Sequence, residues 1–307
     1  MKGYEQLRES AAWHDLAGRG KIKLTGEDRA RLLHAMSTNH IQQLQPGQGC
    51  YAFFLSAQGR ILGDSNILCF DDHFLLDTEP EIAGKMYQHL DRFIIADDVT
   101  LEDLTTALVT IAVEGPQSAA VLAAAGAPVP SAEYSHAAWG ARTVARLNYT
   151  GSCGLFVIGP AAEKDDIVRA LETAGAMEAD RDAFEAVRLE HGKARYGDDL
   201  SERYLSQESN QMHALNFNKG CYLGQEIVER VRARAQIHRR LWPLLIEATE
   251  APPAGAKLTS GDKPAGEITS AAYSPGLGKV AALAYVRVEF ERPGTELQSG
   301  GAKAVVA

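Results

Sequence analysis

Residues 218–230 read Asn-Lys-Gly-Cys-Tyr-Leu-Gly-Gln-Glu-Ile-Val-Glu-Arg, and no other stretch of the chain is as informative. It places a single thiol, Cys221, between Lys219 and a run of polar and glycine positions. A cysteine acts as a nucleophile or a metal ligand only as the thiolate, and nearby cations such as Lys219 and Arg230 favour that form. We therefore predict a functional loop around Cys221. The alternative is a buried structural thiol beside Tyr222.

Composition indicates a globular protein of two or three subdomains. The chain has 307 residues, of which 45% are hydrophobic and 23% charged, which is ordinary for a folded protein. The start has no apolar segment of signal-peptide length, and no apolar run approaches the roughly 18 residues of a membrane span. We expect a cytoplasmic protein with no membrane partner.

The cysteines are too scattered for a disulfide framework or a self-contained metal site. They are Cys50, Cys69, Cys153 and Cys221, and no two are separated by only two residues. Zinc and iron–sulfur sites typically take four ligands. We therefore predict no metal site of the chain's own, and a cluster held through Cys221 would need a second protein.

The charge distribution argues against nucleic acid and for a local anionic ligand. A net charge of −9 disfavours direct nucleic-acid binding, which requires a basic face. One segment is basic although the chain as a whole is acidic. It is the basic stripe, made of Arg230, Arg232, Arg234, Arg239 and Arg240, with no acid among residues 230–240. The stripe is either an anion-binding segment or a solvated face.

The pattern of apolar residues predicts an α+β body of split βαβ units. Two segments repeat the order strand, glycine turn, helix, and their glycines are Gly26 and Gly115. Strands are predicted at 51–55, 61–69, 74–77, 107–113, 144–147 and 155–158, and helices at 81–93, 161–174 and 182–191. Past residue 240, short strand-like runs separated by Pro and Gly predict a small antiparallel barrel or sandwich. The predicted domains are 1–240, with approximate interleaved halves 20–105 and 106–240, and 241–307.

The stretch around Cys221 resembles the motif of the YgfZ family, folate-binding proteins related to the glycine-cleavage T-protein and linked to iron–sulfur enzymes. The motif positions are Lys219, Gly220, Cys221, Tyr222, Gly224, Gln225, Glu226 and Arg230. Further segments resemble the same families: Leu24-Thr25-Gly26-x-Asp28, Pro46-Gly47 through Gln58-Gly59-Arg60-Ile61, and Arg188-Leu189-Glu190-x-Gly192. The resemblance spans residues 20–240 and implies an aminomethyltransferase-like folate-binding body followed by a small β-barrel.

The resemblance also implies the site residues. In the T-protein, an aspartate after a Gly-Gly-Ile run contacts reduced folate and is required for methylene transfer. Asp64 stands at that position, but Gly63 replaces the acid that precedes it. Tyr51 corresponds to an aromatic residue that lines the folate site, and Glu190 is expected to accept two hydrogen bonds from the pterin. Each of the three has a plain structural alternative, as a turn, core or surface residue.

Cations near the cavity mouth would match the carboxylates of the folate glutamate tail. Lys219 and the basic stripe, including Arg230, are the predicted partners of that tail. The predicted cofactor is tetrahydrofolate or a derivative. The resemblance adds a possible transient iron–sulfur cluster that Cys221 shares with client or carrier proteins.

Three functions follow from these residues. The first is a tetrahydrofolate-binding accessory protein for assembly or repair of iron–sulfur enzymes, including those that modify tRNA, acting through Cys221. The second is an aminomethyltransferase that moves a one-carbon unit to tetrahydrofolate through Asp64. The third is a non-catalytic folate-responsive binding module. The retained Asp64 favours the second function, and the cysteine motif favours the first.

Overall fold

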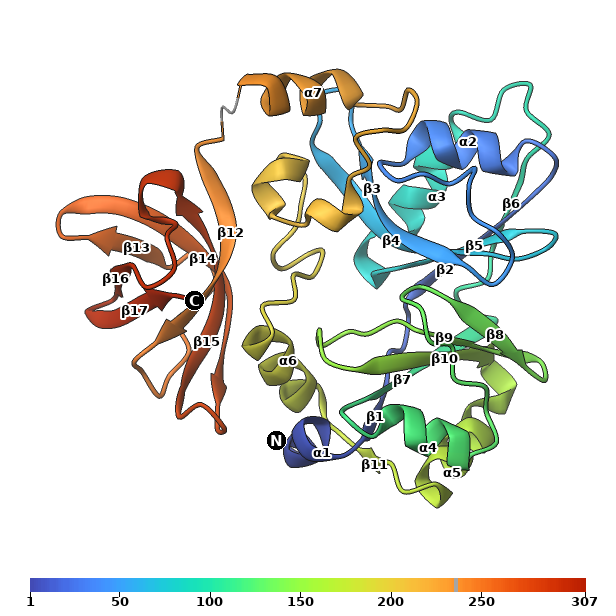
Figure 1. The fold of residues 1–307 in the computed structure, drawn as a ribbon, viewed down its shortest axis with the longest axis horizontal. Helices are drawn as coiled ribbons and strands as arrows, with labels where there is room; N and C mark the ends of the chain where they lie inside the picture. The colour runs from blue at the N-terminus through green and yellow to red at the C-terminus, as the bar shows by residue number, and fades with distance from the viewer. Residues whose placement is uncertain (235–236) are drawn as a thin grey trace.

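The computed structural model describes residues 1–234 and 237–307 and has three parts, namely two β-sheets with their helices and a closed barrel (Figure 1). The first sheet has the strand order β3-β4-β5-β2-β6, and all its neighbours are antiparallel. Its strands are β2 (Gly20–Thr25), β3 (Gly49–Leu55), β4 (Ile61–Cys69), β5 (Phe74–Thr78) and β6 (Thr100–Asp103). Its helices are α2 (Arg29–Met36), the 3₁₀ turn η1 (Pro80–Ile82) and α3 (Ala83–Asp91).

The second sheet has six strands in the order β11-β1-β7-β10-β9-β8. They are β1 (Ala12–Asp15), β7 (Leu108–Glu114), β8 (His136–Trp139), β9 (Arg142–Ala145), β10 (Gly154–Pro160) and β11 (Met177–Glu178). The helices of this part are α1 (Tyr4–Glu9), α4 (Ser118–Ala124), η2 (Ala161–Glu163), α5 (Lys164–Thr173) and α6 (Arg181–Glu190). None of the helices in the described part of the chain is both long and apolar enough to cross a membrane.

The predicted strand–glycine–helix repeat is present, once in each sheet. Gly26 joins β2 to the turn before α2 with φ of 101°, and Gly115 follows β7 with φ of 116°. A Cβ atom at Gly26 would lie 2.0 Å from the carbonyl oxygen of Asp98, and one at Gly115 would lie 2.6 Å from that of Ser10. Glycine is required at both turns because of the left-handed backbone and the close approach.

The two sheets are interleaved along the chain. Strand β1 precedes the first sheet in sequence but belongs to the second. After α6 the chain returns to the first sheet, where the backbone N–H of Ile61 donates to the carbonyl of Tyr204 at 3.2 Å. That returning segment carries η3 (Ser206–Ser209), η4 (Met212–Ala214) and α7 (Gln225–Arg234). This returning segment, which lies within the predicted half 106–240, therefore packs with the sheet of the half 20–105.

The C-terminal part is a closed antiparallel barrel, in the order β12-β15-β14-β13-β16-β17. Its elements are β12 (Arg239–Ile246), β13 (Lys257–Ser260), β14 (Lys263–Ser274), β15 (Lys279–Arg287), η5 (Val288–Phe290), β16 (Glu296–Ser299) and β17 (Ala302–Val306). The predicted α+β fold class with a C-terminal barrel is confirmed. The strand-like runs predicted past residue 240 lie at 242–247, 256–259, 266–274, 280–288 and 302–306. They omit β16, whose four residues carry only one buried apolar side chain, Leu297.

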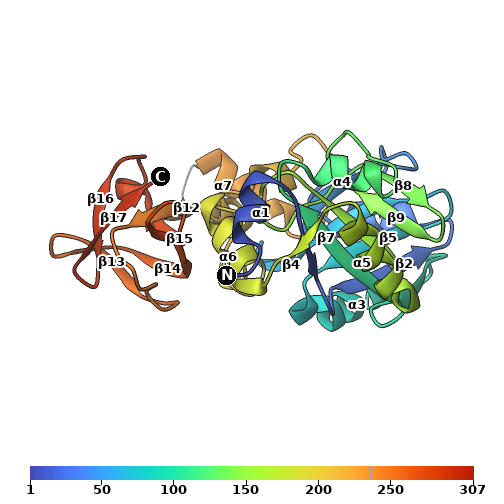
Figure 2. The same ribbon diagram turned by 90° about the horizontal axis from the view of Figure 1, so that it is seen from below.

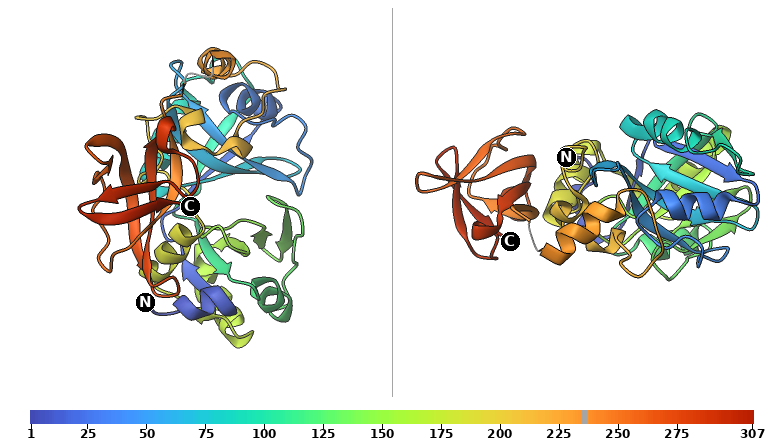
Figure 3. Two further views of the ribbon diagram at one scale, coloured as in Figure 1. Left: turned by 60° about the vertical axis from the view of Figure 1, so that its left-hand side comes forward. Right: turned by 90° about the horizontal axis from the view of Figure 1, so that it is seen from above.

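A buried ion pair fastens the barrel to the body through α6, which lies between the barrel and the two sheets (Figures 2 and 3). Arg188 of α6 contacts Asp199 at 2.7 Å, and both side chains are fully buried. The other oxygen of Asp199 accepts hydrogen bonds from the hydroxyls of Thr269 and Ser270 in β14. One carboxylate therefore joins the body helix to the barrel strand.

Replacing Asp199 with alanine is expected to lower the free energy of unfolding by about 3–5 kcal/mol, because the buried Arg188 loses its fully buried partner and keeps only the partly exposed Glu185. The matched control is Arg169→Ala, which breaks an exposed pair with Asp166 and is expected to cost less than about 1 kcal/mol. Denaturant titration of the two variants measures both values. Equal costs would show that the buried pair does not hold the barrel.

Candidate functional site

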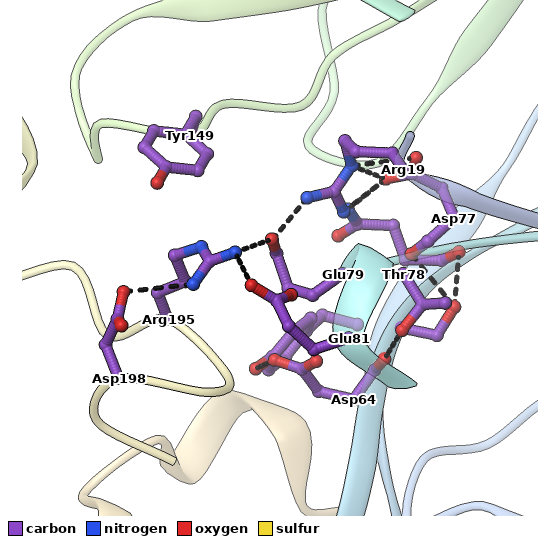
Figure 4. A network of polar contacts seen from close by, with 12 residues as sticks. Arg19, Asp64, Asp77, Thr78, Glu79, Glu81, Tyr149, Arg195 and Asp198 are labelled. Atoms are coloured by element: carbon purple, nitrogen blue, oxygen red, sulfur yellow. Dashed lines mark hydrogen bonds and ion pairs between the residues drawn. The ribbon is translucent and has the colours of Figure 1, made fainter. Parts of the chain in front are cut away.

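The structure brings Asp64 and Tyr51 together inside the body. They lie on the adjacent strands β4 and β3, where Phe53 is the register partner of Asp64. The hydroxyl of Tyr51 donates to Oδ2 of Asp64 at 2.6 Å. The hydroxyl of Thr78 donates to the backbone carbonyl of Asp64, also at 2.6 Å (Figure 4). Two residues that the sequence implicated separately thus form one polar centre.

The Asp64 carboxyl group has a perturbed pKa. Burial raises the pKa of Asp64 to about 6, and the negative charge of Glu79 adds to this effect. The hydrogen bond from Tyr51 and the charges of Arg19 and Lys193 act in the opposite direction. The pKa of Tyr51 is raised well above its ordinary value by burial and by Asp64. A carboxyl group with a pKa near 6 is mostly ionised at neutral pH and is suited to accepting a proton.

Asp64 faces a small inner recess that opens into a larger chamber. The recess has a volume of about 50 Å³, and the outer chamber has about 400 Å³. Both are lined by Asn66, Asn148, Lys193 and Gln211, so they adjoin. The outer chamber falls within the range of roughly 300–1,000 Å³ that is usual for small-molecule sites.

A network of buried ion pairs forms one wall of the recess (Figure 4). Arg19 contacts Asp77 at 2.7 Å and also pairs with Glu79. Glu79 is shared with Arg195 at 3.1 Å. Because these charges satisfy one another, the wall is rigid and is already neutralised. Lys21 adds a further contact with Asp77 at 2.8 Å.

Lys193 also lines the recess, and sequence reasoning missed it. It is part-buried and belongs to both the recess and the outer chamber. Burial lowers its pKa, although the charges of Glu114 and Asp64 oppose that shift. Its position one residue after the Arg188–Gly192 run was an available signal, since that run was already expected to reach the site.

Glu190 does not lie at the Asp64 recess. Its carboxylate accepts hydrogen bonds from Tyr4 and, at 2.5 Å, from Ser274 of the barrel. Arg8 lies 3.4 Å from its other oxygen. Glu190 instead lines a wide cavity of about 740 Å³ that adjoins the outer chamber, together with Arg8 and Cys153. In this structure its hydrogen bonds join the N-terminal helix to the barrel, which is a structural alternative to the predicted contact with the pterin.

The Lys219 side chain binds the backbone at the end of α2. Its ammonium group donates to the carbonyl oxygens of His34, Ser37 and Asn39, at 2.5, 2.5 and 2.9 Å. Three N–H donors thus meet the carbonyls left free where a helix ends. Burial lowers the pKa of Lys219 to about 7, while the carbonyl dipoles favour the charged form.

The other residues around Cys221 hold the loop in place, whereas the thiol itself is exposed. Tyr222 is buried, with its ring 4.9 Å from the Lys219 ammonium. Gly224 has φ of 86°, and a Cβ atom there would lie 2.6 Å from the carbonyl oxygen of Ser56. Helix α7 begins immediately afterwards at Gln225. Packing therefore accounts for these motif residues but not for the identity of Cys221.

Neither Cys221 nor the basic stripe lines the recess or its outer chamber. Arg230 pairs with Glu226 at 2.6 Å within α7, so both of these motif residues lie on the exposed helix surface. Arg232, Arg239 and Arg240 likewise pair with carboxylates, namely those of Glu229, Glu208 and Glu291. Residues 235 and 236, inside the stripe, lie outside the described residues. Over the described chain, no group of three His, Cys, Asp or Glu side chains is arranged to hold a metal ion.

This architecture belongs to a known protein family. Residues 2–219 match the family model of the GCVT N-terminal domain. Residues 239–305 match the model of the glycine cleavage T-protein C-terminal barrel domain. The chain therefore belongs to the GCVT N-terminal domain family and carries the barrel domain as well. The barrel match begins where β12 begins, two residues before the predicted boundary at 241.

Relatives and a solved structure agree with this assignment. An aminomethyltransferase of Rubrobacter xylanophilus is 29% identical, over 94% of this chain and 79% of its own length. A putative chloroplast transferase of Arabidopsis thaliana is 26% identical, over 83% of this chain and 60% of its own. The crystal structure of the glycine cleavage system aminomethyltransferase T from Bartonella henselae has the same fold. Its TM-score is 0.91 at 22% identity, over 99% of this chain and 87% of that one.

The Asp64 pKa leads to a prediction about stability. The pKa of an aspartate is ordinarily 3.8, and that of Asp64 in the folded protein is about 6. The folded state therefore binds the proton of Asp64 more tightly than the unfolded state does. This stabilisation is fully present below about pH 4 and is lost as the pH rises through 6. The loss is about 3 kcal/mol. The Asp64→Asn variant should lack it and become the more stable protein above pH 6.

Urea denaturation at several pH values between 4 and 8 measures this difference, with Asp262→Asn, at an exposed position, as the control. Parallel pH profiles for the wild type and Asp64→Asn would contradict the shifted pKa.

Proposed function

We propose that this protein binds reduced folate in the cavity at Asp64 and transfers a one-carbon unit there, as an aminomethyltransferase does. The observation that carries the proposal is the buried Tyr51–Asp64 pair, in which a carboxyl group with a pKa of about 6 faces a recess. The family membership supports it, because several relatives are named aminomethyltransferase. Asp64, whose retention in the sequence already favoured an aminomethyltransferase, is the residue that we propose takes part in the transfer.

The residues of the cavity fit a reduced folate. A pterin presents ring N–H and amino donors, and Asp64 offers an ionised acceptor for them. Asn66, Asn148 and Gln211 add amide groups that both donate and accept at the junction with the outer chamber. Buried polar groups at a cavity require such partners. A folate bound here would complete the hydrogen bonding that the recess leaves open.

Asp64 can serve the transfer step in two ways. When a folate nitrogen attacks the carbon of an aminomethyl donor, the new C–N bond replaces the bond from that carbon to the donor's leaving group, which departs with the electron pair. The nitrogen becomes positively charged, and a nearby carboxylate stabilises that charge. The same carboxylate can accept the proton that the nitrogen releases, since its pKa lies close to neutral pH. Tyr51 fixes the orientation of the carboxylate through the 2.6 Å hydrogen bond. Gly63, in place of the T-protein's first acid, leaves Asp64 as the strand's one acid at this turn.

A second candidate function rests on Cys221. The loop from Lys219 to Gly224 is held by buried contacts and yet exposes the thiol, and it matches the YgfZ motif. This supports an accessory protein that binds tetrahydrofolate and assists iron–sulfur enzymes through Cys221. Since one cysteine cannot hold a cluster alone, that function requires a client or carrier protein to supply the other ligands.

Isothermal calorimetry with tetrahydrofolate, followed by a turnover assay, tests the first proposal. The wild type is expected to bind and, with an aminomethyl donor, to form a one-carbon-substituted tetrahydrofolate detectable by mass spectrometry. Asp64→Asn should reduce turnover by on the order of 10²–10⁴-fold, the usual contribution of acid–base catalysis, while Cys221→Ser should retain it. Binding without turnover in the wild type would instead indicate a folate-responsive binding module.

Complementation of a strain that lacks the protein separates the two candidates. The activity of a cluster-dependent enzyme is the measurement. If Asp64 carries the function, Cys221→Ser should rescue and Asp64→Asn should not. If the accessory function is correct, Cys221→Ser should fail to rescue the strain, because serine keeps the size of the side chain but forms no thiolate at neutral pH. Loss of rescue by Cys221→Ser, with folate affinity unchanged, would overturn the first proposal in favour of the second.

A further inference from the structure

Lys193 stands where the inner recess meets the outer chamber and lines both of them. Its backbone is fixed on both sides by the buried Arg188. The Lys193 N–H donates to the carbonyl of Arg188 at 3.0 Å, and the Arg188 guanidinium donates to the Lys193 carbonyl at 2.5 Å. Any ligand that extends from Asp64 into the outer chamber must therefore pass a lysine whose position is set by the core.

This lysine lacks an ion-pair partner among residues 1–234 and 237–307. The nearest carboxylates act on it only through space, and burial lowers its pKa despite them. An ammonium group withdrawn from water without a paired anion is costly. The other cations of the recess wall do have ion-pair partners. Arg19 is paired with Asp77, and Arg195 is paired with Glu79. Lys193 is thus the charge in the recess that an anionic ligand would neutralise.

Arg146 provides a second cation farther out. It lines the outer chamber and also the wide cavity of about 740 Å³ beyond it. Its guanidinium donates to the carbonyl of Pro130 at 3.3 Å. Within the described chain it forms no ion pair, although Glu133 lines the same two cavities. The histidines that face this space are His191 and His213.

We propose that Lys193 and Arg146 form an anion subsite that binds the carboxylates of the glutamyl part of a reduced folate. The inference rests on the proposed folate function and extends it to the substrate's other end. The two ends of a folate differ in chemistry, with N–H donors on the pterin and carboxylates on the glutamate. The charge of the cavity lining changes in a matching way. The acid Asp64 lies in the recess, the cation Lys193 lies where the recess meets the outer chamber, and the cation Arg146 lies in the outer chamber. A guanidinium can hold a carboxylate with two parallel hydrogen bonds.

This assignment moves the tail away from the basic stripe. The stripe's Arg230, Arg232, Arg239 and Arg240 are paired with glutamates, and none of them lines the outer chamber. An arginine that must first leave its own ion pair gains less from a ligand carboxylate than a cation that has no pair. Arg234, the fifth arginine of the stripe, is exposed and does not line the chamber either. Lys193 and Arg146 are therefore better placed than the stripe.

Two ligands and three variants test the subsite. Tetrahydrofolate carries the carboxylates, and 6-methyltetrahydropterin carries only the ring. Lys193→Met and Arg146→Met should each weaken tetrahydrofolate binding by on the order of 10-fold or more, as expected for a hydrogen bond to a charged group. Arg146→Met should leave the affinity for 6-methyltetrahydropterin close to that of wild type, because Arg146 lines the outer chamber and not the recess. Lys193→Met also alters the recess, so it should weaken tetrahydrofolate binding more than it weakens binding of 6-methyltetrahydropterin. Arg230→Met, the control on the stripe, should change neither affinity.

Calorimetry gives the affinities, and thermal melting confirms that each variant is folded. Unchanged tetrahydrofolate binding in both cavity variants would overturn the subsite while leaving the folate function intact. Equal weakening for the two ligands would overturn it as well, because the effect would not depend on the carboxylates. Weakening by Arg230→Met alone would assign the tail to the basic stripe. A wild-type protein that binds neither ligand would overturn the folate function, and the subsite with it.

Discussion

The buried carboxylate of Asp77 is the constraint on which the site depends. It has no solvent exposure and contacts both Arg19 and Lys21. Burial alone would raise its pKa, but the charges of those two cations outweigh burial and hold the pKa well below its usual range. The network continues from Arg19 through Glu79 to Arg195, so segments before β2, after β5 and after α6 are joined by charges that cannot separate without exposing an unpaired ion.

Asp64 owes its chemistry to its place beside this network. It shares the buried environment but not the ion pairs, and its charge is supported by the Tyr51 hydroxyl instead. A carboxylate held by a hydrogen bond rather than by a paired cation keeps a pKa near 6, whereas Asp77, with two cations, does not. One fold thus contains a structural acid and a chemically available acid on neighbouring strands.

The Cys221 loop and the Asp64 cavity are separate features of the molecule. Lys219, which the sequence placed next to the thiol as an activating cation, instead holds three carbonyls at the end of α2. Glu190 likewise binds Tyr4 and Ser274 at the barrel contact. Both residues are charged groups whose polar partners come from distant parts of the chain, and each fixes one segment of chain against another.

The sequence by itself determined the α+β body and the C-terminal barrel, because these follow from local signals, whereas Asp64 was singled out only by the family resemblance. Apolar runs set the strands, and the turns at Gly26 and Gly115 require a residue without a side chain. Only the tertiary structure decided which charges meet. Tyr51 reaches Asp64 because β3 and β4 pair in one register, and Lys193 reaches the same cavity because Arg188 fixes its backbone. Residues 200–234 return to the first sheet, which no local pattern signalled. Partners distant in sequence are selected by packing and by the need to neutralise buried charge, and neither can be read from one chain position.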